Sequence, residues 1–79
     1  LKCRVCGKWL IDHAPYTHRI NPYLPLDKVN RVNNLISVHK KCYMAINTPG
    51  MDISDYEKQV QKKILSYREK LVVSHTRNN

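Results

Sequence analysis

The sequence predicts a small α+β domain, and three observations lead to this prediction. The chain has 79 residues, which is enough for one domain but too few to bury a large apolar core. Short apolar segments that favour strands are followed by one long segment with helical periodicity near the C-terminus. Two short motifs with metal-ligand side chains lie far apart in the sequence, and their members are Cys3, Cys6, His39 and Cys42.

These two motifs have the spacing of metal ligands. Cys3 and Cys6 form a Cys-x-x-Cys motif, whereas His39 and Cys42 form a His-x-x-Cys motif. Together they supply the tetrahedral Cys₃His set that binds Zn²⁺ in structural sites. An odd number of cysteines with a well-spaced histidine fits a metal better than disulfides, and the alternatives are a coincidental pair of motifs or redox-active cysteines. Because metal binding would be coupled to folding, removal of the ion should unfold this part of the chain.

The charge balance favours a polyanionic partner. Fourteen Lys and Arg stand against six Asp and Glu, which gives a formal net charge of +8. An excess of this size in so short a chain is typical of nucleic-acid binding, and the alternative is a piece of a longer protein that balances the charge elsewhere. No apolar run approaches a bilayer span, so we expect no membrane partner. Reduced thiols favour a reducing compartment, such as the bacterial cytoplasm or an organelle matrix.

We predict that the first part of the chain, residues 1–50, forms a zinc-bound module. A short strand is expected over residues 8–11, and the proline-rich residues 13–33 predict an ordered but irregular loop. A second strand is expected over residues 34–38, followed by a short helix over residues 40–46.

We predict that the second part, residues 51–73, forms an amphipathic helix. Ser54 and Glu57 have the spacing of a capping box at its start. The apolar residues that recur at helical spacing are Tyr56, Val60, Ile64, Tyr67 and Leu71. This face should pack on the zinc-bound module, with Lys and Arg side chains outward. Residues 74–79 are expected to form a flexible tail.

The residues between the two metal-ligand motifs add a more specific pattern. The strings THRINPYLP at 17–25, DKVN at 27–30 and NNL at 33–35 lie between them. With CxxCG and HxxC, these strings resemble the HNH endonuclease domain at the C-terminus of group II intron reverse transcriptase/maturases. The resemblance covers residues 3 to about 47. It implies a ββα-metal fold, in which a hairpin and a helix grip a divalent catalytic ion.

The resemblance also implies roles for individual residues. His18 takes a metal-ligand position, Arg19 the general-base position, and Asn34 matches the motif's asparagine. Tyr43 stands where a histidine ligates the catalytic Mg²⁺ or Mn²⁺. The guanidinium of Arg19 stays protonated and cannot act as a general base, and the phenol of Tyr43 is a poor Mg²⁺ ligand. Two of the positions needed for catalysis therefore carry residues that cannot perform their role. In an alternative alignment, His18 becomes the base and Thr17 faces a weakly held metal.

Three functions are compatible with these patterns. The first is a nucleic-acid-binding domain of a maturase-like protein whose nuclease activity is lost or weak. It would contact target DNA or intron RNA during intron homing or RNA splicing, alongside the rest of the parent reverse transcriptase/maturase chain. The second is an active Mg²⁺- or Mn²⁺-dependent endonuclease that nicks one DNA strand to prime reverse transcription. The third is a zinc scaffold for protein–protein contact.

Candidate nucleic-acid contacts in the first function are Arg19, Lys28, Arg31, Lys40 and Lys41. A purely structural interpretation stands beside each special residue. His18 would be a hydrogen-bonded loop residue and Asn34 a turn residue. Trp9 and Tyr43 are expected to fill the core rather than to stack on bases.

Overall fold

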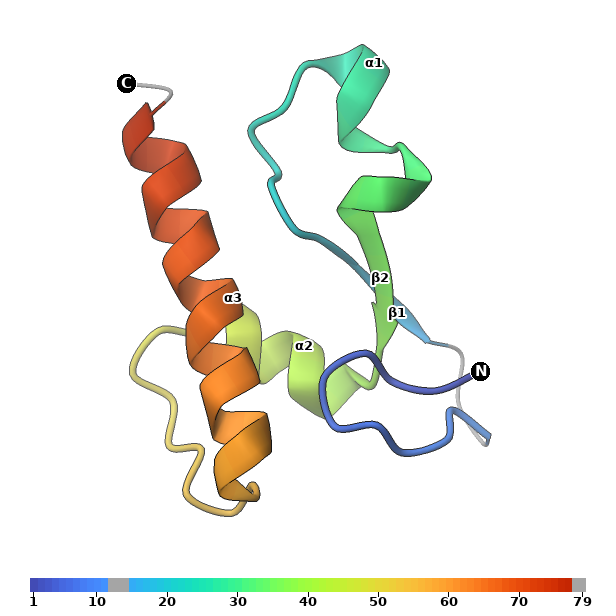
Figure 1. Ribbon diagram of the computed structural model, residues 1–79, viewed down its shortest axis with the longest axis vertical. Helices are drawn as coiled ribbons and strands as arrows, with labels where there is room; N and C mark the ends of the chain where they lie inside the picture. The colour runs from blue at the N-terminus through green and yellow to red at the C-terminus, as the bar shows by residue number, and fades with distance from the viewer. Residues whose placement is uncertain (12–14, 78–79) are drawn as a thin grey trace.

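The computed structural model describes residues 1–11 and 15–77, with side chains described as far as residue 72. The elements in chain order are β1 (Tyr16–Arg19), α1 (Leu26–Val29), the 3₁₀ helix η1 (Val32–Asn34), β2 (Leu35–Val38), α2 (Lys40–Asn47) and α3 (Lys58–Arg77). A small α+β domain is therefore confirmed, with one two-stranded hairpin and a long C-terminal helix (Figure 1). Among the described helices, none has the length and apolar character needed to cross a membrane.

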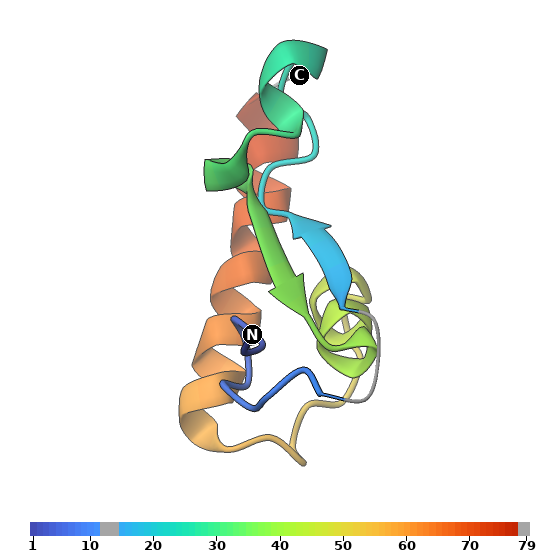
Figure 2. The same ribbon diagram turned by 90° about the vertical axis from the view of Figure 1, so that its right-hand side faces the viewer.

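The hairpin is antiparallel, and its strands are joined by a long connection that contains α1 and η1. Tyr16 pairs with Val38 at one end and Arg19 with Leu35 at the other (Figure 2). The prediction of an irregular loop over residues 13–33 is wrong for β1 and α1. Prolines flank these elements rather than interrupt them, so pairing with β2 could form a strand where the sequence alone indicated a loop.

The core lies where α2 packs between the hairpin and α3 (Figure 1). Its fully or almost fully buried apolar residues are Val5, Ile36, Val38, Ala45, Ile46 and Ile64. The predicted apolar face of the last helix contacts this core, with Ile64 fully buried and Val60, Tyr67 and Leu71 around it. Helix α3 therefore covers this core with its apolar face.

Three predicted boundaries are wrong. Residues 8–11 form no strand, and only an isolated bridge joins Trp9 to Lys2. The last helix begins at Lys58, so Ser54 is not its N-cap; Ser54 lies instead in a turn, where its backbone N–H donates to the Asp52 carboxylate at 2.9 Å. The helix continues to Arg77, so residues 74–77 are helical rather than part of a tail, and residues 78–79 lie outside the described residues.

Candidate functional site

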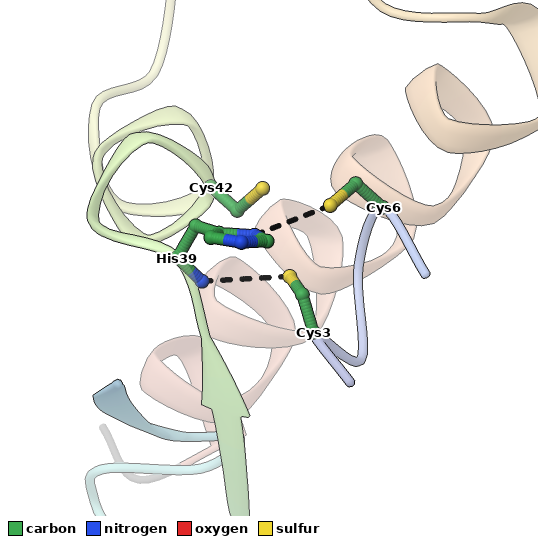
Figure 3. Close-up of side chains that lie close together, drawn as sticks. All are labelled: Cys3, Cys6, His39 and Cys42. Carbon is green, nitrogen blue, oxygen red and sulfur yellow. Dashed lines mark hydrogen bonds between the residues drawn. The ribbon is translucent and has the colours of Figure 1, made fainter. Parts of the chain in front are cut away.

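The fold brings the four predicted metal ligands together. Cys3 and Cys6 lie on the N-terminal turn, His39 follows β2, and Cys42 lies in the first turn of α2 (Figure 3). Their donor atoms all lie within 4.8 Å of one another. Tetrahedral Zn²⁺ needs ligand separations of about 3.3–3.8 Å, so small side-chain adjustments suffice to hold an ion. The cluster could therefore bind a metal such as Zn²⁺, as the spacing of the motifs predicts.

The N-terminal turn is shaped to present both of its cysteines. Gly7 has a φ of +77°, which a residue with a Cβ rarely adopts, and its N–H donates to the Cys3 carbonyl at 2.9 Å. The N–H of Arg4 donates to the carbonyl of Ser37 on β2 at 3.0 Å. The turn is thus fastened to the strand that leads into His39.

The imidazole of His39 is oriented by a backbone contact. Its Nε2 lies 3.1 Å from the carbonyl oxygen of Trp9, and its Nδ1 lies 3.3 Å from Sγ of Cys6. A carbonyl oxygen can only accept, so Nε2 carries the proton and Nδ1 is left with its lone pair toward the centre of the cluster. A histidine that ligates a metal through one nitrogen commonly donates from the other in this way.

Two of the sulfur atoms also receive hydrogen bonds. The backbone N–H of His39 donates to Sγ of Cys3, and the hydroxyl of Tyr56 donates to Sγ of Cys42, each at 3.5 Å. Burial, together with the Cys42 thiol, raises the pKa of Tyr56, which keeps its hydroxyl protonated as a donor. Such donors stabilise a thiolate once it has formed.

The thiols of the cluster differ in acidity. Burial alone would raise the pKa of Cys3, but backbone hydrogen bonds from Cys6, His39 and Val5 outweigh it and lower this pKa to about 6. Burial and the neighbouring cysteines raise the pKa of Cys42 to about 12. Crowded thiolates oppose one another's ionisation, and a bound divalent cation would remove that conflict.

His18 lies in a separate, buried environment between β1, α2 and α3. Its side chain is 2 % exposed, and its Nδ1 is 3.3 Å from the amide nitrogen of Asn47. The rings of Tyr43 and Tyr67 approach it edge-on, with centroids 6.2 and 6.0 Å away. Within the described part of the chain, Nε2 has no hydrogen-bond partner. Burial lowers the pKa of His18, so the imidazole is neutral.

The resemblance assigns catalytic roles to several residues besides His18, but the structure does not gather them all around His18. Alternation along β1 places the exposed Thr17 and Arg19 on the opposite face of the strand. Nε of Arg19 donates to Oδ1 of Asn30 at 2.9 Å. Of the other residues that the resemblance assigns to catalysis, Tyr43 alone lies against His18, and Asn47, one turn later on α2, also contacts it. Asn47 was not predicted, although its spacing of four from Tyr43 on a helix could have indicated a shared face.

Asn34 has a structural position at the far end of the hairpin. It is 5 % exposed, and its amide donates to the carbonyls of Val29 and Asn21, at 2.8 and 3.0 Å. Its Oδ1 accepts from the N–H of Asn21 at 2.9 Å. Asn34 therefore holds together the connection between the two strands.

The five candidate nucleic-acid contacts are all exposed, and they form two groups. One group, near α1, consists of Arg19, Lys28 and Arg31. The other group, at the start of α2 beside the four candidate metal ligands, consists of Lys40 and Lys41. These two places are at opposite ends of β2 (Figure 1).

The expected burial of Trp9 is wrong, because its side chain is 59 % exposed; Tyr43 is half-buried and packs on the core, as expected.

Comparisons of the chain with protein-family models, with curated proteins and with solved structures returned no match. Its function is therefore inferred from its own residues.

Proposed function

We propose that this chain is a nucleic-acid-binding domain of HNH type, built around a structural zinc ion, whose nuclease activity is lost or weak. The observation that carries the proposal is the charge around the metal cluster. Residues 1–11 and 39–51, which supply all four metal ligands, contain five Lys and Arg and no Asp or Glu, and Lys8, Lys40 and Lys41 outnumber Asp55 and Glu57 in the lining of the groove beside these ligands. A surface of this kind attracts phosphate groups.

The order of elements supports the HNH assignment. A hairpin, β1 with β2, is followed directly by α2, and the Cys/His cluster joins the N-terminal turn to the junction between β2 and α2. This is the arrangement that the resemblance to maturase HNH domains implies. The proposed ligands are accordingly target DNA or intron RNA, and the proposed parent is a maturase-like reverse transcriptase.

The environment of His18 supports loss of cleavage. A phosphodiester nuclease of this kind needs a divalent ion that polarises the phosphate and a base that activates water. His18 is buried against an amide and two phenol rings, none of which is a strong Mg²⁺ ligand. Arg19 lies on the other face of β1, hydrogen-bonded to Asn30.

Binding can be tested by fluorescence anisotropy with labelled DNA and RNA over a range of salt concentrations. The affinity of the zinc-loaded protein should fall steeply with salt, because phosphate contacts dominate. The pair Lys40→Ala/Lys41→Ala should weaken binding and lower the salt slope, by about 0.7–0.9 for each lost phosphate contact. The control Lys62→Ala/Lys63→Ala removes the same charge from an exposed part of α3. An equal effect of both pairs, or no binding at all, would contradict the proposal.

Cleavage can be tested separately with a nicking assay in Mg²⁺ or Mn²⁺. The wild-type chain should give little or no product, and Arg19→His with Tyr43→His should not restore cleavage, because position 19 lies on the face of β1 opposite His18. Robust wild-type cleavage that His18→Ala abolishes would instead establish an active endonuclease.

A second candidate function is a zinc scaffold for protein contact, and an open groove favours it. This groove has a volume of about 1010 Å³ and lies beside the metal cluster. Apolar side chains in its lining include Leu10, Tyr16, Met44, Met51 and Val60. Failure to bind both DNA and RNA at low salt would leave this candidate as the better one.

A further inference from the structure

Trp9 is exposed where a tryptophan is normally covered. It is the chain's only tryptophan, and 59 % of its side chain is accessible. Tryptophan is highly buried on average in folded proteins. Leu1 and Ile11 on the same segment are exposed as well, at 71 % and 78 %, so the inference rests on the aromatic ring and the charges around it rather than on exposure alone.

The segment that presents Trp9 is held from several sides. A β-bridge pairs Trp9 with Lys2, and the N–H of Leu10 donates to the carbonyl of Leu1 at 2.9 Å. On the other side, the Trp9 carbonyl accepts from His39, a member of the metal cluster. The backbone that supports the indole is therefore fixed before any partner arrives, which reduces the entropy lost on binding.

The surroundings of the indole are positively charged. Nζ of Lys2 lies over the Trp9 ring, 4.9 Å from its centroid, so a base would stack on the opposite face of the indole or displace this ammonium group. Arg4 and Lys8 are also exposed, and residues 1–11 contain no acidic side chain. A protein partner would have to cover these cations with acids of its own, whereas a nucleic acid supplies anionic phosphates and flat aromatic bases together.

We propose that Trp9 is a stacking platform for an unpaired base, with Lys2 and Lys8 contacting the adjacent phosphates. This inference rests on the proposed function and specifies its ligand as single-stranded nucleic acid. In a duplex, each base face is covered by its neighbours, so an indole on a surface cannot reach one. In a single strand the base faces are open, and base–aromatic stacking tolerates any sequence.

Because Trp9 is the chain's only tryptophan, its own fluorescence reports on the contact. The zinc-loaded protein is titrated with oligo(dT) and oligo(U) of about ten nucleotides, and with a duplex of the same length. The single strands should quench Trp9 fluorescence, and the duplex should bind more weakly and leave it largely unquenched. In anisotropy measurements with labelled strands, Trp9→Leu should weaken binding by about 5- to 150-fold, the range of one stacked base. Trp9→Phe should keep most of the affinity.

The control is Ile11→Ala, which removes exposed apolar surface two residues away without removing a ring. It should leave the affinity unchanged, and all variants should bind Co²⁺ with the wild-type visible spectrum. Strand binding without quenching and without loss in Trp9→Leu would overturn the inference while the proposed function stands. Equal weakening by Trp9→Leu and Ile11→Ala would overturn it in favour of apolar docking. Absence of binding to every nucleic acid would defeat the proposed function itself.

Discussion

Nε2 of His39 lies 3.1 Å from the carbonyl oxygen of Trp9, so one imidazole links the four candidate metal ligands to the backbone of the residue that carries the exposed indole. The same ring places Nδ1 3.3 Å from Sγ of Cys6. Nε2 donates its proton to the backbone carbonyl, and the lone pair on Nδ1 could coordinate a metal ion. Loss of the metal should therefore disturb both the fold and the surface that Trp9 presents.

Metal removal should unfold the domain. Zinc-binding peptides of this kind gain about 10–16 kcal/mol from the ion, which is comparable with the whole stability of a small protein. A chelator, or the substitution Cys42→Ser, should therefore abolish the cooperative thermal transition in circular dichroism. Re-addition of Zn²⁺ should restore the transition in the wild-type chain but not in Cys42→Ser. A chelated protein that keeps its transition would show that the fold is independent of the metal.

The metal cluster could be predicted because each half is a local motif. The separation of Cys3 from Cys6, and of His39 from Cys42, is fixed by one turn of backbone, so the sequence shows it directly. The boundaries of α2 were predictable as well, because they too depend on residues that are close together in the sequence. The exposure of Trp9 could not be predicted, because a tryptophan is normally buried and the sequence does not show how the residues around the four metal ligands pack.

Asn34 illustrates a feature that only the three-dimensional structure identifies. Asn34→Ala removes three hydrogen bonds with Asn21 and Val29 and leaves buried backbone groups unpaired. We expect a loss of about 2–4 kcal/mol in the free energy of unfolding, measured by urea denaturation of the zinc-loaded protein. The neighbouring Asn33→Ala is the control, because Asn33 is exposed, and it should change stability by less than about 0.5 kcal/mol. Equal effects of the two substitutions would contradict this role.

Arg68 also differs from its expected role. Its position off the apolar face of the helix predicts a solvated cation, yet its Nε donates to the carbonyl of Ala45 at 2.8 Å. A second guanidinium nitrogen donates to the carbonyl of Met51 at 3.1 Å, so Arg68 ties α3 to the end of α2 and the loop after it. The sequence could not show this, because the partners are backbone carbonyls without a residue pattern.

Replacing Arg68 should therefore loosen the attachment of α3. Arg68→Ala is expected to cost about 1.5–3 kcal/mol, the range for hydrogen bonds to a charged group, in the free energy of unfolding. Lys62→Ala, on an exposed position of the same helix, should cost far less. Hydrogen exchange can localise the effect, since amides of α2 and α3 should lose protection in Arg68→Ala. Unchanged protection would show that the two contacts contribute little.

The buried His18 should make stability depend on pH. Burial holds the pKa of His18 below its ordinary value of 6.5, so over the interval beneath 6.5 the unfolded chain binds the proton and the folded one does not. Stability from this residue is then complete above about pH 6.5 and declines as the pH falls, by about 1.4 kcal/mol for each unit between the two pKa values. The tyrosines and the amide that face His18 supply no carboxylate to oppose this. His18→Phe, which keeps an aromatic ring between Tyr43 and Tyr67, should flatten the urea-unfolding profile between about pH 5 and 7. Zinc release in acid affects both proteins and cancels in the difference between them, so identical profiles would show that His18 is not the titrating group.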